Sequence, residues 1–138
     1  MISTLSVRVG SREKNEGGEI FQVALVRSHP KYNPYTYNYD FALLQLRYSI
    51  NFDGVTKAPI ELPELNEPIF KGMEVFVTGW GATQSLTESN RYLRGVTISI
   101  VDQENCNNIY KYDGGISDRM VCAAAPGKDS CAVRFLLL

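Results

Sequence analysis

Apolar and polar residues alternate strictly along two segments of this 138-residue chain, residues 5–9 and 96–100. Neighbouring side chains of a β-strand lie on opposite faces, so this alternation places one face on a core and the other in water. The pattern is typical of antiparallel sheets. Because the dominant period along the chain is two rather than 3.6, the sequence predicts an all-β fold.

More continuously apolar stretches indicate further strands. Residues 20–26 and 74–78 predict buried strands, and residues 41–46, which contain three leucines, predict another. Loops rich in glycine, proline or tyrosine separate the strands, at residues 14–18, 29–39 and 111–117. Short strands separated in this way suggest a barrel or a sandwich.

One short helix is predicted near residues 102–110. Asp102 is of a type that caps helix N-termini, because its carboxylate accepts a hydrogen bond from a backbone amide of the first turn. Cys106, Ile109 and Tyr110 follow at roughly helical spacing. The predicted helix is about two turns long.

The composition, with 44% hydrophobic and 21% charged residues, is that of an ordinary globular domain. Fourteen Lys and Arg residues against 15 Asp and Glu residues leave a net charge of −1. No basic stripe points to a nucleic-acid partner. No run of 18 apolar residues occurs, so we expect no membrane partner.

The chain has three cysteines and one histidine. An odd number of cysteines leaves at least one thiol without an internal partner. No CxxC pair occurs, and a single histidine makes a Cys/His zinc site improbable. We therefore predict neither a metal nor a cofactor.

Four polar or glycine-flanked features, each taken alone, have an ordinary structural explanation. His29 reads as a loop histidine, and Asp40 as a carboxylate that caps a loop where a strand begins. The glycines around Trp80 suggest a strand end where the backbone passes close to the aromatic ring. Residues 127–131 read either as a surface turn or as a pocket floor whose acid faces a cationic ligand.

Taken together and in chain order, these features are far more specific. The ordered set is His29-Pro30 with Tyr32-Asn33, Asp40 to Leu44, Gly79-Trp80-Gly81, Cys106, Met120 to Ala123, and Lys128 to Cys131. This set resembles the trypsin-like serine endopeptidases of the chymotrypsin family, over residues 5–131. The resemblance implies a partial double β-barrel, with residues 1–131 forming the end of the first barrel and the start of the second. Residues 132–138 would be a divergent apolar tail.

The resemblance also implies roles for three polar residues. Asp40 matches the triad aspartate, which orients the catalytic imidazole and stabilises its charged form. Asp129 matches the acid at the floor of the specificity pocket, where it would pair with Arg or Lys of a protein or peptide substrate. Ser130 lines the same pocket.

The cysteines also have counterparts in the family. Cys106 and Cys122 match a disulfide around the short helix, with 15 residues between them, which would contribute roughly 3 kcal/mol. Cys131 matches a half-cystine whose partner lies further along the family chain, so we expect it to be unpaired. Paired cysteines need an oxidising compartment, and the family is secreted, so the resemblance implies an extracellular protein. Residues 1–10 do not form a signal peptide.

Other family features are missing from the sequence. His29 falls in a loop motif and does not match the catalytic histidine, and residues 132–138 do not resemble the segment of the catalytic serine. Many relatives bind calcium in the loop at residues 10–19, but Ser11 stands at its first acidic position, although Glu16 and Glu19 remain. Two interpretations stay open: an inactive fragment of a trypsin-like endopeptidase, or a non-catalytic homologue that acts as a binding or regulatory module.

Overall fold

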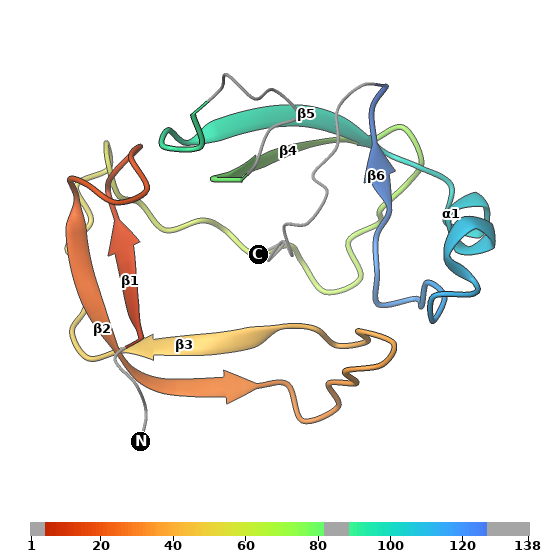
Figure 1. The fold of residues 1–138 in the computed structure, drawn as a ribbon, viewed down its shortest axis with the longest axis horizontal. Coiled ribbons are helices and arrows are strands. Elements are labelled where there is room, and N and C mark those ends of the chain that lie inside the picture. Colours follow the sequence, from red (N-terminus) through yellow and green to blue (C-terminus); the bar gives the residue numbers. More distant parts are fainter. Residues whose placement is uncertain (1–4, 82–88, 127–138) are drawn as a thin grey trace.

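The computed structural model describes residues 5–81 and 89–126, and its strands form two three-stranded antiparallel sheets (Figure 1). The first sheet has the order β1-β2-β3, with strands β1 (Ser6–Val9), β2 (Glu19–Ser28) and β3 (Ala42–Leu46). The second has the order β4-β5-β6, with strands β4 (Glu74–Gly79), β5 (Arg94–Ile100) and β6 (Ala123–Ala124). The all-β prediction is thereby confirmed.

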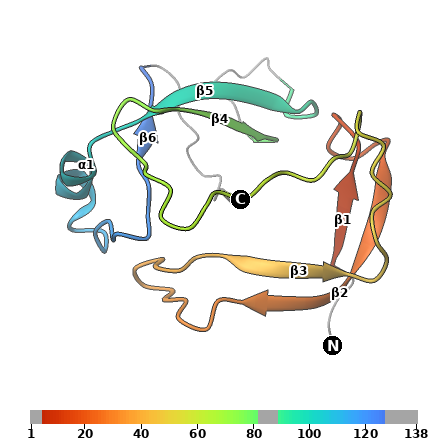
Figure 2. The ribbon, with the colours of Figure 1, turned by 180° about the vertical axis from the view of Figure 1, so that it is seen from behind.

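Strand β2 forms the corner of the first sheet. Its first part pairs with β1, from Val9↔Glu19 to Ser6↔Gln22, and its second part pairs with β3 as far as Ser28↔Ala42. The register shifts between Val23 and Leu25, and such an irregularity bends a strand. Figures 1 and 2 show β1 and β3 leaving this corner in different directions.

Strand β5 of the second sheet follows the predicted alternation closely. Val96, Ile98 and Ile100 of β5 turn inward, and Thr97 between them is exposed. Strand β6 pairs with the end of β5 through Ile100↔Ala123. This strand is two residues long, too short to give a periodic signal, and it was not predicted.

The one helix in the described residues, α1, spans Gln103–Tyr110 and confirms the prediction near residues 102–110. Asp102 is its N-cap, and the Asp102 side chain accepts a hydrogen bond from the Asn105 amide at 2.9 Å. In the described residues, no helix is long and apolar enough to cross a membrane.

The predicted burial of three strands is wrong. In β3, Leu43 and Leu44 are 64% and 45% exposed. In β2 only Val23 is buried, and in β4 no residue is buried, with Phe76 69% exposed. Among the described residues, the buried hydrophobic side chains are Val23, Ile98, Ile100 and Cys106. An apolar strand is buried only when a second layer covers its face, and no other described strand or helix packs on the first sheet.

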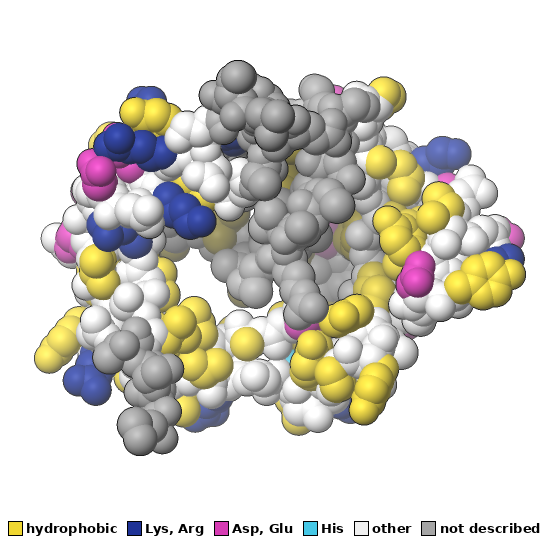
Figure 3. All heavy atoms as spheres, in the orientation of Figure 1, with side chains coloured by type: hydrophobic (Ala, Val, Ile, Leu, Met, Phe, Trp, Pro, Cys, Tyr) yellow, Lys and Arg dark blue, Asp and Glu magenta, His cyan; other side chains and the backbone are white. Residues whose placement is uncertain are grey.

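Within the part of the chain that the structure describes, the two sheets meet at two places rather than along their whole length (Figures 1 and 2). At one end, the loop between β1 and β2 reaches the segment that leads into β5. At the other, the loop between β2 and β3 reaches the segment after α1. Figure 3 shows the molecule hollowed between these two contacts.

Candidate functional site

Asp40 lies at the end of the loop that joins β2 to β3, two residues before β3 begins. The two ends of this loop meet, because the His29 amide donates a hydrogen bond to the Phe41 carbonyl oxygen at 3.1 Å. Asp40 itself is exposed. The fold therefore presents this carboxylate at the surface, next to a paired strand end.

His29 packs within the same loop. Its ring stacks on Tyr39 at a centroid distance of 4.5 Å and an interplanar angle of 3°, and it lies 4.7 Å from the ring of Phe41. The Nδ1 atom of His29 accepts a hydrogen bond from the Lys31 amide at 3.2 Å. A triad histidine instead donates from Nδ1 to the aspartate. The imidazole of His29 is therefore not arranged as a triad base.

The segment after α1 contacts the loop that carries Asp40. The Ser117 hydroxyl donates a hydrogen bond to Oδ1 of Asn38 at 2.9 Å. The Arg119 guanidinium lies over the ring of Tyr39, 5.8 Å from its centroid. We call these four residues, Asn38, Tyr39, Ser117 and Arg119, the aspartate junction.

Helix α1 holds the second-sheet side of the aspartate junction. Nε2 of Gln103 donates hydrogen bonds to the carbonyl oxygens of Ser117 and Met120 at 2.8 and 3.0 Å. A disulfide joins Cys106 of the helix to Cys122, the pair that the family resemblance implied, with Cα atoms 6.4 Å apart. The segment that carries Ser117 is thus attached to α1 by both hydrogen bonds and a covalent link.

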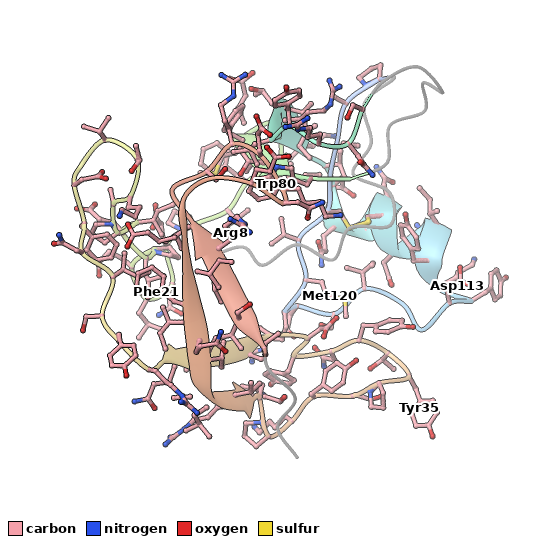
Figure 4. All side chains as sticks on the ribbon, turned by 60° about the vertical axis from the view of Figure 1, so that its left-hand side comes forward. Arg8, Phe21, Tyr35, Trp80, Asp113 and Met120 are labelled. Atoms are coloured by element: carbon pink, nitrogen blue, oxygen red, sulfur yellow. A yellow bond between two sulfur atoms is a disulfide. The ribbon has the colours of Figure 1, made fainter. Side chains whose placement is uncertain are left out.

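At the opposite end, backbone groups join the loop after β1 to the start of β5. The Lys14 amide donates to the Arg91 carbonyl oxygen at 2.9 Å, and the Leu93 amide donates to the Arg12 carbonyl oxygen at 2.7 Å. Nε1 of Trp80 donates to the same Arg12 oxygen at 3.1 Å. Figure 4 shows Trp80 at this place, between the strands of the two sheets.

Charged side chains reinforce this second contact. Nε of Arg91 donates to a carboxylate oxygen of Glu13 at 2.7 Å, and its NH2 group donates to Glu16 at 2.8 Å. The hydrogen bond to Glu13, with the negative charges of Glu13 and Glu16, raises the pKa of Arg91. We call Arg91, Glu13 and Glu16 the arginine clasp.

The two loop acids considered for calcium both have cationic partners within the chain. Glu16 belongs to the arginine clasp, and Glu19 forms an ion pair with Lys57. Within residues 5–81 and 89–126, no group of three or more His, Cys, Asp or Glu side chains is arranged to hold a metal ion.

Three residues predicted from the sequence, Asp129, Ser130 and Cys131, lie outside the described residues. The same holds for the tail at residues 132–138. The structure therefore places Asp40 and the disulfide, and the pocket residues stay predictions.

Sequence reasoning missed the residues that hold the Asp40 loop from the second sheet. Ser117 and Asn38 are 79 positions apart, and no local pattern links them. The one available signal was Ser117 itself, a polar residue within a glycine-containing loop that leads toward the second cysteine.

The fold, with its two small antiparallel sheets, one late helix and a disulfide beside that helix, is of the chymotrypsin type. The family model described as Trypsin matches residues 2–132. The chain therefore belongs to the trypsin family of serine proteases. It is 42% identical over 131 residues to "Trypsin 5G1" of Aedes aegypti, covering 94% of this chain and 49% of the relative.

Two solved structures agree with this assignment. Neuropsin, a serine protease expressed in the limbic system of mouse brain, superposes with a TM-score of 0.79 at 30% identity, over 95% of this chain and 59% of that one. The scabies mite inactivated protease paralogue S-D1 gives a TM-score of 0.77 at 29% identity, over 86% and 52%. The chain spans about half the length of the curated relatives it matches.

Proposed function

We propose that this chain is part of a trypsin-like serine endopeptidase that cleaves protein or peptide substrates after Arg or Lys. Residues 1–131 would supply the end of the first barrel and the start of the second, and residues 132–138 a divergent tail. The observation that carries this proposal is the position of Asp40. It stands before a paired strand, in a loop that is held from both sheets, as a triad aspartate must be fixed in place.

The proposed preference for Arg or Lys rests on Asp129 and Ser130. A carboxylate at the floor of a pocket that excludes water strongly favours a cationic guest, because an unpaired buried charge is costly. Ser130 would add a hydroxyl that can accept a hydrogen bond from the guest. The expected partner is therefore a peptide with an exposed Arg or Lys side chain.

We further propose that the 138-residue chain is inactive on its own. Acyl transfer by this family needs a histidine base and a serine nucleophile beside the aspartate. The sequence contains one histidine, and its Nδ1 atom already accepts the Lys31 amide. Removing triad members costs about a million-fold in rate in a comparable protease.

An esterase assay tests this inactivity. The purified chain, with its disulfide formed, is incubated with an arginine ester, and we expect no turnover above buffer. The variant Asp40→Ala and the matched control Asp113→Ala should give the same background. Turnover that Asp40→Ala abolishes and Asp113→Ala retains would show that the chain is catalytic.

Reading the full transcript across both ends tests the fragment proposal. A segment like Ala-His-Cys before the described strands and one like Gly-Asp-Ser-Gly-Gly after Cys131 would support an active endopeptidase of which this chain is part. A transcript that encodes only these 138 residues would count against that proposal and favour a non-catalytic product.

We also propose that the protein works outside the cytosol. The disulfide between Cys106 and Cys122 supports this, because such links persist in oxidising compartments. To test this, the protein is expressed and recovered from culture medium and from cell lysate. We expect the Cys106–Cys122 disulfide in the protein from the medium.

A second candidate function is a non-catalytic homologue that recruits or regulates other proteins. It is favoured by the structural similarity to a protease paralogue described as inactivated. Saturable binding of a basic peptide, lost in Asp129→Asn and kept in Asp118→Asn, would support it. If both variants still bind the peptide, Asp129 does not bind its basic side chain.

A further inference from the structure

We propose that Ser117 is a positioning residue for Asp40: through Asn38, its hydroxyl holds the segment that precedes Asp40 in a strained backbone conformation. Arg119 also contacts this segment, through a cation–π interaction with the ring of Tyr39. The link between this geometry and catalysis rests on the proposed function, in which Asp40 is the triad aspartate. The geometry itself can be tested without catalysis.

The backbone before Asp40 is strained at two residues. Tyr37 and Tyr39 have φ angles of 56° and 55°, in the left-handed region. Few residues other than glycine adopt this region, and bulky side chains are disfavoured there. Such conformations persist only where the surrounding structure imposes them, and they concentrate at functional sites. The segment therefore needs contacts that hold it in place.

The loop supplies part of these contacts itself. The Asn33 amide donates to the Asn38 carbonyl oxygen at 3.0 Å, and the Phe41 amide donates to the Tyr39 carbonyl oxygen at 2.8 Å. His29 stacks on the ring of Tyr39. All of these groups belong to residues 29–41, so they move together if the loop moves. They fix the shape of the loop and leave its position relative to the second sheet open.

Ser117 supplies a hydrogen bond from the segment after α1 that helps to fix this position. Its hydroxyl, which is partly buried, donates to Oδ1 of Asn38 at 2.9 Å. The same Oδ1 atom accepts the Tyr39 amide at 3.2 Å. One oxygen thus couples a hydroxyl of the segment between α1 and β6 to the strained residue next to Asp40. Arg119 adds a cation–π contact to the Tyr39 ring.

The Ser117 side of this link is itself rigidly held. Gln103 binds the carbonyl oxygens of Ser117 itself and of Met120, and Cys122 is joined to the helix by the disulfide. Because this segment is held in place, the Ser117 hydroxyl holds its partner Asn38 in a defined position. Fixed positions matter at a catalytic site, because a displacement of about 1 Å can cost roughly a hundredfold in rate.

Amide hydrogen exchange at single-residue resolution tests the proposal on the full 138-residue chain. In Ser117→Ala, exchange of the His29 and Phe41 amides should accelerate roughly five- to tenfold, as expected when one hydrogen bond that closes the segment is lost. Ser117→Thr, which keeps the hydroxyl, should restore the protection. The carboxyl ¹³C signal of Asp40 should shift in Ser117→Ala and return in Ser117→Thr.

Ser89→Ala is the matched control. Its hydroxyl accepts the Arg91 amide at the other end of the molecule, so its loss should leave the His29 and Phe41 amides unchanged. The proposal is overturned if Ser117→Ala leaves these amides unchanged, if both serine variants affect them equally, or if they are unprotected in the parent chain. None of these readouts needs turnover, so a failure of the proposed endopeptidase function would be seen separately.

Discussion

The two junctions between the sheets are built from different interactions. The arginine clasp end uses charged side chains at the surface together with backbone hydrogen bonds between two extended segments. The aspartate junction uses one hydrogen bond between neutral side chains and a cation–π contact of Arg119 with Tyr39, backed by a disulfide on one side. Both connect residues more than 70 positions apart.

This difference in interactions indicates that one junction holds the two sheets together and the other fixes the position of a side chain. Exposed ion pairs tolerate movement, since long side chains can follow each other, and dissolved salt screens them. A single hydroxyl on a rigid support allows one geometry. We infer that the arginine clasp end keeps the sheets together, and that the aspartate junction sets where Asp40 stands.

Removing the disulfide should have the largest effect of the changes considered. In the double variant Cys106→Ser, Cys122→Ser, the segment that carries Ser117 loses its covalent link to α1. We expect a loss of about 3 kcal/mol in the free energy of unfolding, measured by denaturant titration. Hydrogen exchange at the aspartate junction should rise more than at residues 89–94. Cys131→Ser is the control, and an equal loss of stability there would contradict the assignment.

The second largest effect should follow loss of the arginine clasp. Arg91→Gln removes the cation shared by Glu13 and Glu16, in the same junction in which the Trp80 indole donates to the Arg12 carbonyl oxygen. Because Trp80 is the only tryptophan, its fluorescence reports this junction alone, and we expect a shift to longer wavelength. Raising NaCl from 0.05 to 1 M should produce a smaller shift in the parent and almost none in the variant.

Arg27→Gln is the matched control for this experiment, since it removes one arginine from the far part of β2. It should leave the Trp80 spectrum and its dependence on salt as in the parent. An equal spectral shift in both variants would mean that net charge, rather than the clasp, controls this junction.

How far the sequence predicted the molecule depends on the distance over which each interaction acts. Strict alternation located β5 and its inward residues, and Asp102 located the start of α1. The exposure of Leu43 and Leu44 was not predictable, because it depends on whether another layer covers β3. Periodicity shows which side chains of a strand can be buried, but it does not show whether another layer of the fold covers them.

The candidate site divides in the same way. Asp40 and the cysteine pair came from a resemblance to a family, which is information about whole folds. The contacts of Ser117 and Arg91 depend on side chains that meet across 79 and 75 or more positions. The left-handed conformation of Tyr39 also could not be predicted from the sequence, because tyrosine does not favour it.

Acid should loosen the turn at residues 53–57, which lies against Gly10 at the end of β1, before it affects the aspartate junction. The Thr56 hydroxyl and the amides of residues 55–57 donate to the Asp53 carboxylate and lower its pKa well below the usual range. A carboxylate with a lowered folded-state pKa contributes stability above its unfolded value, near 4, and loses it as the pH falls toward the folded value. Lys57, at the end of this turn, pairs with Glu19 of β2.

A pH titration from 6 to 2 measures this effect through hydrogen exchange of the Val55 and Thr56 amides, which both donate to Asp53. Their protection should fall below about pH 4 in the parent chain. In Asp53→Asn, protection should be lower at pH 6 and nearly independent of pH. Glu61→Gln serves as a control carboxylate and should titrate like the parent; parallel loss in all three chains would assign the effect to general acid unfolding.

Calcium should have the smallest effect of the changes considered. If added calcium changes nothing, the charged side chains of the arginine clasp bind each other and not a metal ion. Ca²⁺ needs six to eight oxygen ligands, whereas Glu16 already faces the Arg91 guanidinium and Glu19 faces Lys57. Adding millimolar CaCl₂, or removing divalent ions with EDTA, should leave both the Trp80 spectrum and the unfolding midpoint unchanged. If CaCl₂ raises the midpoint in the parent and Arg91→Gln enlarges the increase, the guanidinium competes with a metal. The clasp end would then respond to divalent ions, whereas the four residues of the aspartate junction include no carboxylate that could bind them.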